Sequence, residues 1–120
     1  RVLEGHTQVV LAVASLGDGR VVSGSEDKTL RVWRVADGSC ERVMEGHTDM
    51  VTAVASLGDG RVVSASLDHT LRVWRVADGV CERVLEGHTD VVTAVASLGD
   101  GRVVSGSIDK TLRVWRVADG

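Results

Sequence analysis

The chain has 120 residues, with 14 lysines and arginines against 17 aspartates and glutamates, and a formal net charge of −3. It contains three tryptophans and no phenylalanine, tyrosine or proline, so its apolar residues are mainly valine, leucine and alanine, which favours a sheet protein with an aliphatic core. The mild acidity and the scarcity of aromatic residues argue against nucleic-acid binding. No apolar window is long enough to span a membrane.

One sequence unit recurs with a period of 41 residues, as the spacing of His6, His47 and His88 demonstrates. The predicted units are residues 1–41, 42–82 and 83–120. Over the 38 positions from Arg1, the first unit differs from the third at only three positions. Such close identity, together with the absence of an initiator methionine, indicates recent duplication, excision from a longer chain or deliberate engineering.

Within the first unit, turns that contain glycine or aspartate separate four short segments that are rich in apolar residues. In chain order these segments are residues 9–15, 21–25, 30–35 and 40–44. The turns recur about every ten residues, too often for helices, so the pattern predicts four antiparallel strands joined by tight hairpins. The first segment is almost wholly apolar and the later ones carry charge, as at Arg31 and Glu41. Each sheet is therefore predicted to have a dry inner strand and a wet outer strand.

The first unit contains Gly5-His6, then Ser23-Gly24-Ser25, Asp27 and Leu30-Arg31-Val32-Trp33. This order of residues, present three times, resembles the WD-repeat β-propeller family, and the resemblance covers the whole chain. It implies an all-β fold with three four-stranded antiparallel propeller blades per chain. Arginine stands where the family has the aspartate after tryptophan, at Arg34, Arg75 and Arg116. Any partner contact through that aspartate is thereby put in doubt.

The resemblance also implies a buried hydrogen-bond network in each blade, in which tryptophan bonds to serine, serine to histidine and histidine to aspartate. The predicted members are His6, Ser23, Asp27, Trp33, His47, Ser64, Asp68, Trp74, His88, Ser105, Asp109 and Trp115. Either Ser23 or Ser25 could supply the hydroxyl. Serine, histidine and aspartate are also the parts of a hydrolase triad, but no oxyanion hole is indicated, and buried polar groups need such partners. The chain is therefore not expected to be an enzyme.

No cofactor or metal site is predicted. Gly17 and Gly19 flank Asp18 in a hairpin turn, and the third glycine and the helix of a phosphate-binding loop do not follow. The histidines recur once per unit without a second ligand at metal-like spacing. Cys40 and Cys81 occupy equivalent positions on stacked sheets about 10 Å apart, too far for a disulfide. We expect free thiols and a reducing, cytoplasmic location.

Three blades do not close a ring, because propellers have about four to eight blades and each blade buries both faces. Residues 1–4 match the outer-strand segment 42–45, and the sequence stops before the matching segment of the third unit. We therefore expect the N-terminal strand of a neighbouring identical chain to complete the last blade, in a ring closed by homo-oligomerisation. Small alanine and valine side chains between blades favour a homotrimer of nine blades, with a homodimer of six as the alternative.

One end of each predicted blade carries most of the differences between the units. The residues of this candidate partner-binding face are Gln8, Asp49, Asp90, Glu26, Leu67, Ile108, Lys28, His69 and Lys110. In the family that the chain resembles, this end docks peptides and proteins. The predicted function is a non-catalytic, self-assembling β-propeller scaffold, engineered or excised, with a protein-binding face in its ancestry. The alternatives are a natural WD-repeat interaction module and, more distantly, a serine hydrolase.

Overall fold

The computed structural model describes residues 2–118, which form eleven β-strands. The strands are β1 (Val10–Ser15), β2 (Arg20–Ser25), β3 (Thr29–Arg34), β4 (Cys40–Glu45), β5 (Val51–Ser56), β6 (Arg61–Ser66), β7 (Thr70–Arg75), β8 (Val80–Glu86), β9 (Val92–Ser97), β10 (Arg102–Ser107) and β11 (Leu112–Arg116). Within this range there is no helix long and apolar enough to cross a membrane.

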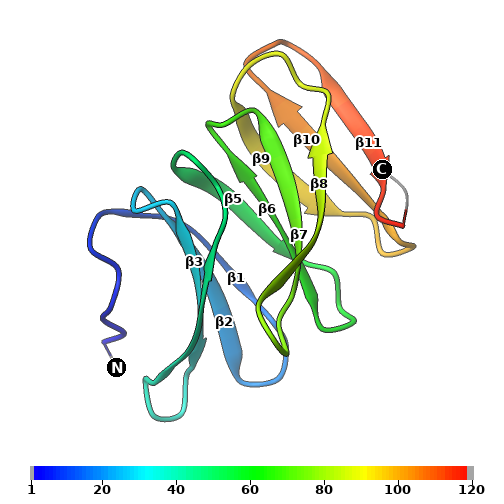
Figure 1. Ribbon diagram of the computed structural model, residues 1–120. Helices are drawn as coiled ribbons and strands as arrows, with labels where there is room; N and C mark the ends of the chain where they lie inside the picture. Colours follow the sequence, from blue (N-terminus) through cyan, green and yellow to red (C-terminus); the bar gives the residue numbers. More distant parts are fainter. Residues whose placement is uncertain (1, 119–120) are drawn as a thin grey trace.

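The strands form three antiparallel sheets that follow one another along the chain (Figure 1). Two sheets have four strands, in the orders β1-β2-β3-β4 and β5-β6-β7-β8, and the third has the order β9-β10-β11 within the described range. The predicted fold class, an all-β chain of antiparallel blades, is confirmed. The outer strand of each four-stranded sheet runs across a predicted unit boundary, because β4 and β8 take most of their residues from the following unit.

Glycine at two turn positions lets the first hairpin close tightly. Gly17 and Gly19 both have a φ of 84°, a left-handed conformation that costs glycine little. The Leu16 amide donates to the Arg20 carbonyl at 2.9 Å, and the Arg20 guanidinium lies 2.7 Å from the Asp18 carboxylate. The same turn recurs in the other two sheets, so it fixes the register between the first two strands of every blade.

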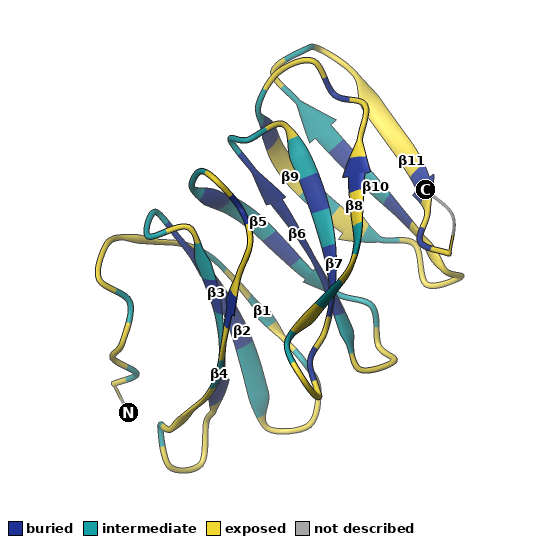
Figure 2. Cartoon of the chain, viewed as in Figure 1, coloured by how far each residue is buried: buried dark blue, intermediate teal, exposed yellow. Residues whose placement is uncertain are grey.

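The hydrophobic core consists of two apolar layers, each between neighbouring sheets. Val22, Leu30, Val32 and Met44 of the first sheet pack against the second sheet. The second-sheet residues in this layer are Val51, Val54, Val62, Trp74 and Val76. An equivalent layer joins the second sheet to the third (Figure 2). Each of these layers buries one face of both sheets, so the middle sheet is covered on both faces.

Burial does not follow the predicted order from a dry inner strand to a wet outer one. In the middle sheet, the second strand, β6, is buried at every position after Arg61, whereas β5 is fully buried only at Val51 and Val54. The second strand has a hydrogen-bonded neighbour along each edge and a sheet over each face, while the first strand has one bare edge. The outer strands β4 and β8 are mostly exposed or half-buried, as their charges predicted.

The two interfaces between blades differ at one level of the core. We name them the first interface, between the first and second sheets, and the second interface, between the second and third. A Cβ added at Gly24 on β2 would lie 2.6 Å from Val51 Cγ1 across the first interface. At the equivalent position of the second interface, Ala65 already carries a methyl group and is buried in the layer that contains Val92. The first interface is therefore the closer of the two at this level.

We expect Gly24→Ala to lower the free energy of unfolding by about 1–3 kcal/mol, because the methyl group overpacks the contact with Val51. Chemical denaturation would measure the loss. The matched control is Gly106→Ala, where the nearest atom to an added Cβ is Leu112 Cδ2 at 3.4 Å, and both variants are compared at a concentration low enough for the chain to be monomeric. That change should stay within about 0.5 kcal/mol. Equal losses in both variants would contradict the closer packing of the first interface.

Candidate functional site

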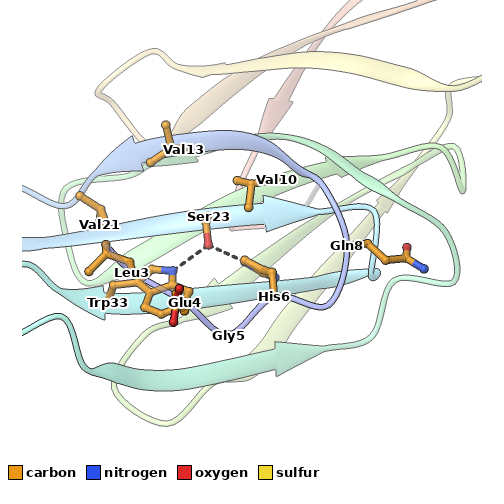
Figure 3. Close-up of a pocket in the computed structure, with 10 residues that line it drawn as sticks. All are labelled: Leu3, Glu4, Gly5, His6, Gln8, Val10, Val13, Val21, Ser23 and Trp33. Atoms are coloured by element: carbon orange, nitrogen blue, oxygen red, sulfur yellow. Dashed lines mark hydrogen bonds between the residues drawn. The ribbon is translucent and has the colours of Figure 1, made fainter. Parts of the chain in front are cut away.

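The first blade contains a chain of four hydrogen-bonded side chains. His6, from the loop before β1, lies with Nε2 2.6 Å from the Ser23 Oγ of β2 and with Nδ1 2.8 Å from Oδ2 of Asp27. The Trp33 indole N–H of β3 donates to the same Ser23 Oγ at 2.8 Å (Figure 3). The network thus joins the loop before β1, which we call the entry loop, to the central strands β2 and β3 and to the turn between them.

The other two blades repeat this geometry. His47 Nδ1 lies 2.8 Å from Asp68 Oδ2, and His47 Nε2 lies 2.6 Å from Ser64 Oγ, which accepts from the Trp74 indole N–H at 2.8 Å. His88 lies 2.8 Å from Asp109 and 2.7 Å from Ser105, which accepts from Trp115 at 2.8 Å. The twelve residues that the sequence grouped by resemblance are therefore brought together blade by blade.

The serine that the sequence left open is Ser23. The Ser25 hydroxyl instead donates to the Val9 carbonyl at 2.8 Å and accepts from the Asp27 amide at 3.1 Å. Ser25 therefore ties the turn after β2 to the loop before β1, while Ser23 contacts the imidazole of His6.

The donor inventory assigns the direction of every bond in the network. The Asp27 carboxylate only accepts, so the single ring proton of a neutral His6 lies on Nδ1 and points to it. His6 Nε2 then accepts the Ser23 hydroxyl proton, and Ser23 Oγ in turn accepts from the Trp33 indole nitrogen, which only donates. Each polar atom of the chain has a partner of the right kind, as buried polar groups require.

Asp27 is the anchor of this network and also caps the turn that follows it. Its Oδ1 accepts from the Thr29 amide at 3.0 Å and from the Thr29 hydroxyl at 2.6 Å, and its Oδ2 also accepts from the Thr7 amide at 3.1 Å. Burial raises the pKa of the Asp27 carboxyl, but the hydrogen bonds from Thr29 and His6 outweigh it and hold this pKa well below its ordinary value of 3.8.

The carboxyl groups of Asp68 and Asp109 have equally lowered pKa values. For Asp68, burial is again opposed by stronger hydrogen bonding, from His47 and Thr70. For Asp109, the hydrogen bond from Thr111 is the largest cause and outweighs the effect of burial, with His88 adding to it. All three network aspartates are therefore held as carboxylates at neutral pH.

The contacts of Ser23, His6 and Asp27 follow the order of a hydrolase triad, but the serine is not presented to a substrate. The equivalent Ser64 is 0 % exposed, and all three serines are buried. Each serine oxygen already accepts a tryptophan N–H, which engages a lone pair that a nucleophile would need. The arrangement positions a loop against a sheet rather than a nucleophile against a carbonyl group.

Between residues 2 and 118, no three histidine, cysteine, aspartate or glutamate side chains are grouped in a way that could hold a metal ion. Cys40 and Cys81 are free thiols, Cys40 exposed and Cys81 half-buried.

The nine residues of the candidate partner-binding face lie at one end of the blades. They come from the loop before the first strand of each sheet and from the turn between its second and third strands. Backbone bonds join these segments: Glu26, Leu67 and Ile108 donate to the carbonyls of Val9, Met50 and Val91 at 2.9, 3.1 and 3.1 Å. The remaining members, apart from the half-buried Asp49, are exposed: Gln8, Asp90, Lys28, His69 and Lys110.

The structure adds apolar neighbours to this face. Met50 and Val91 are half-buried and lie across the strand pair from Leu67 and Ile108, whose side chains are half-buried and exposed respectively. The pairs alternate with acidic Asp49 and Asp90, which accept from the next amide in the chain. The face therefore combines two apolar pairs with carboxylates. The signal in the sequence was that positions 50 and 91 differ between units and are apolar.

Three antiparallel blades, each with a buried tryptophan–serine–histidine–aspartate network, define a repeat protein of the β-propeller class. The family described as WD domain, G-beta repeat (WD40) matches residues 1–34, 38–75 and 79–116, and the chain belongs to this family. WD40 repeats indicate a scaffold for protein–protein interaction, and the family is in general non-catalytic.

Similar stretches occur in much longer proteins. Over 42 residues the chain is 43% identical to F-box/WD repeat-containing protein 7 of Drosophila melanogaster, which covers 35% of the chain and 3% of that protein. Over 40 residues it is 55% identical to WD repeat-containing protein pop1 of Schizosaccharomyces pombe, covering 33% of the chain and 5% of that protein. The vegetative incompatibility protein HET-E-1 of Podospora anserina is 55% identical over 38 residues, covering 31% and 3%. The matches thus span a small fraction of each relative.

The network should make stability depend on acid pH. The pKa of Asp68 is lowered by folding, so its stabilisation is present above its ordinary value of 3.8 and is lost as the pH falls toward and below that value. We expect the free energy of unfolding to fall as the pH is lowered from 6 to 3. Chemical denaturation at a series of pH values would measure this fall. Asp68→Asn should lower stability at pH 7 and flatten this dependence.

The matched control is Asp59→Asn, which removes an exposed carboxylate paired with Arg61. Exposed pairs contribute little, so this variant should keep the wild-type pH profile. An Asp68→Asn profile parallel to that of the wild type would contradict the assigned role of the carboxylate.

Proposed function

We propose that the protein is a non-catalytic interaction scaffold whose propeller ring is closed by identical chains, with the variable end of the blades as its face for peptide or protein partners. One observation carries this proposal: the outermost faces of the first and third sheets are apolar and open, although the equivalent faces inside the chain are buried. The near-identity of the three units fits recent duplication or engineering. A cytoplasmic location, supported by the free thiols of Cys40 and Cys81, is part of the proposal.

The open face of the first sheet carries apolar residues of the kind that are buried in the second sheet. Val10, Val13 and Val35 are exposed there, Val13 at 67 %, although the equivalent residues of the second sheet are buried in the first interface. A cavity of about 500 Å³ lies over this face, lined among others by Leu3, Val10, Val13 and Trp33 (Figure 3). In the second sheet, the equivalent space is occupied by the preceding blade.

The open face of the third sheet is apolar in the same way. Leu112 and Val114 of β11 are 76 % and 59 % exposed, whereas the equivalent Leu71 and Val73 are fully buried in the second interface. Contiguous apolar surface of this kind marks an interaction site. The third sheet thus exposes the face that the first and second sheets each cover with the following blade.

The two open faces fit head to tail. The packing of one sheet on the next occurs twice within the chain, and the same residue types would meet if the third sheet of one copy packed on the first sheet of another. Leu3 supports this arrangement. It corresponds in the repeat to Met44 and Leu85, which are almost fully buried on the outer strands, yet no strand includes it among the described residues. Pairing of residues 2–4 with β11 of a neighbour would supply a fourth strand.

Each copy of the 120-residue chain adds three blades to such an assembly, and head-to-tail contacts close when the blades complete a turn. We propose a trimer of nine blades, because the side chains between sheets are small. The close approach at Gly24 fits a small angle per blade, which a larger ring requires.

We expect the 120-residue chain to run at three times its 12.7 kDa mass in size exclusion with light scattering. Val114→Glu should remain at one chain mass, because a carboxylate would be buried without a partner in the contact. Val80→Glu, on the exposed start of β8, is the matched control and should assemble like wild type. A wild-type chain that stays monomeric at micromolar concentration would overturn self-assembly, and a mass of two chains would overturn the nine-bladed ring.

The partner-binding face is tested separately. We expect peptides selected by the assembled protein from a random displayed library to be apolar, and Leu67→Glu combined with Ile108→Glu to weaken their binding at least about tenfold, the loss of roughly 1.4 kcal/mol at the centre of a contact. The assembly itself should keep its mass, and Val80→Glu should bind as wild type. Unchanged peptide binding in the double variant would contradict this face, and loss of assembly would place these residues at the contact between chains instead.

A further inference from the structure

A threonine on the inner strand of the middle blade reaches across the second interface. Thr52 is the extra residue of a β-bulge, because Val51 pairs with Ser66 and Ala53 with Ala65, which leaves Thr52 between them unpaired. Its Oγ1 lies 2.6 Å from the Val92 carbonyl oxygen in the third sheet. The distance to the carbonyl of Ala65, in its own sheet, is 3.2 Å. A hydroxyl has one proton, and the shorter contact is the one between blades.

The same bulge position differs in the other two blades. In the first blade it is Leu11, which lies between the paired Val10 and Ala12 and has no proton to donate across the first interface. In the third blade it is Thr93, the unpaired residue between Val92 and Ala94. Thr93 is exposed, and its Oγ1 is 3.4 Å from the Gly106 carbonyl of its own sheet, a weak contact.

We propose that Thr93 is a specificity-determining residue for a second copy of this chain, in which its Oγ1 donates a hydrogen bond to the carbonyl oxygen of Val10 of that copy. The inference rests on the proposed head-to-tail assembly and deepens it. Val10 occupies the position of Val92 in the repeat, so Thr93 would meet it as Thr52 meets Val92. The surface that receives the second copy includes a hollow of about 150 Å³ lined by Ala94, Gly106 and Leu112.

The hollow lies at a glycine that is equivalent to Gly24 of the first interface. Across that interface Val51 packs directly on Gly24, at a distance that leaves no room for a methyl group. Gly106 occupies the same register position as Gly24, and Val10 the same position as Val51. The contact between chains therefore combines the glycine of the first interface with the threonine of the second. Neither interface within the chain has both.

The hydrogen bond matters more between chains than within one. Covering the first sheet removes water from the Val10 carbonyl, and a buried carbonyl that lacks a partner is costly. Leu11 is tolerated at the first interface because the polypeptide itself holds the two blades together, so packing need not overcome the loss of translational freedom. Two separate copies have no such link and depend on every contact that packing offers.

The experiment compares the concentration at which half of the chains are associated, from sedimentation velocity over a dilution series. Thr93→Val keeps the shape of the side chain but removes the donor, and we expect this concentration to rise about threefold to tenfold. Thr93→Ser keeps the hydroxyl and should stay within about twofold of wild type. Thr52→Val should leave association unchanged while lowering the stability of the chain to denaturant.

Three outcomes would count against the inference. Association of Thr93→Val at the wild-type concentration would overturn the role of Thr93 and leave self-assembly intact. Equal weakening by Thr93→Val and Thr93→Ser would assign the effect to packing instead of the hydroxyl, and would also overturn it. A monomeric wild type would overturn both this inference and the assembly on which it rests.

Discussion

Each sheet of this protein has two apolar faces, and the rest of the structure depends on the need to cover both. The middle sheet meets this requirement within the chain, because a layer of valines, leucines and one tryptophan buries each of its faces. The first and third sheets meet it on one side only. The same residue types are therefore buried in the middle of the chain and exposed at its two open faces, as Val73 and Val114 are. Exposure here depends on which neighbours are present and not on residue type.

A hydrogen-bond network stabilises each blade internally. The tryptophan–serine–histidine–aspartate network crosses from the entry loop to the central strands, and its aspartate also caps the following turn. Because one carboxylate accepts from the imidazole, two backbone amides and a threonine hydroxyl, the loop before β1 and the turn after β2 are fixed relative to each other. These are the segments on which the units differ. The network thus provides a rigid base on which changes at positions 26, 67 and 108 leave the blade intact.

Much of this architecture follows from the sequence, since turn residues and a 41-residue period indicate the number of strands and their order, while the resemblance to the WD-repeat family implies the grouping of the network. The sequence could not choose between Ser23 and Ser25, because residues two apart on a strand share a face and only the register separates them. The bulge at Thr52 was equally hidden, since it arises from pairing with β6 and leaves no mark in the polarity pattern. The deeper burial of the second strand also depends on which strands flank it, which residue types alone do not encode.

The offset between sequence units and blades affects how the number of blades can change during evolution. Because β4 and β8 take most of their residues from the unit that follows, each of the first two sequence units is joined to the next by a hydrogen-bonded strand ladder as well as by the chain. A gene rearrangement that adds or removes 41 codons, at whatever point it cuts, would recreate junctions that already exist. The copy number of blades could therefore change in a single recombination event without any new contact having to evolve.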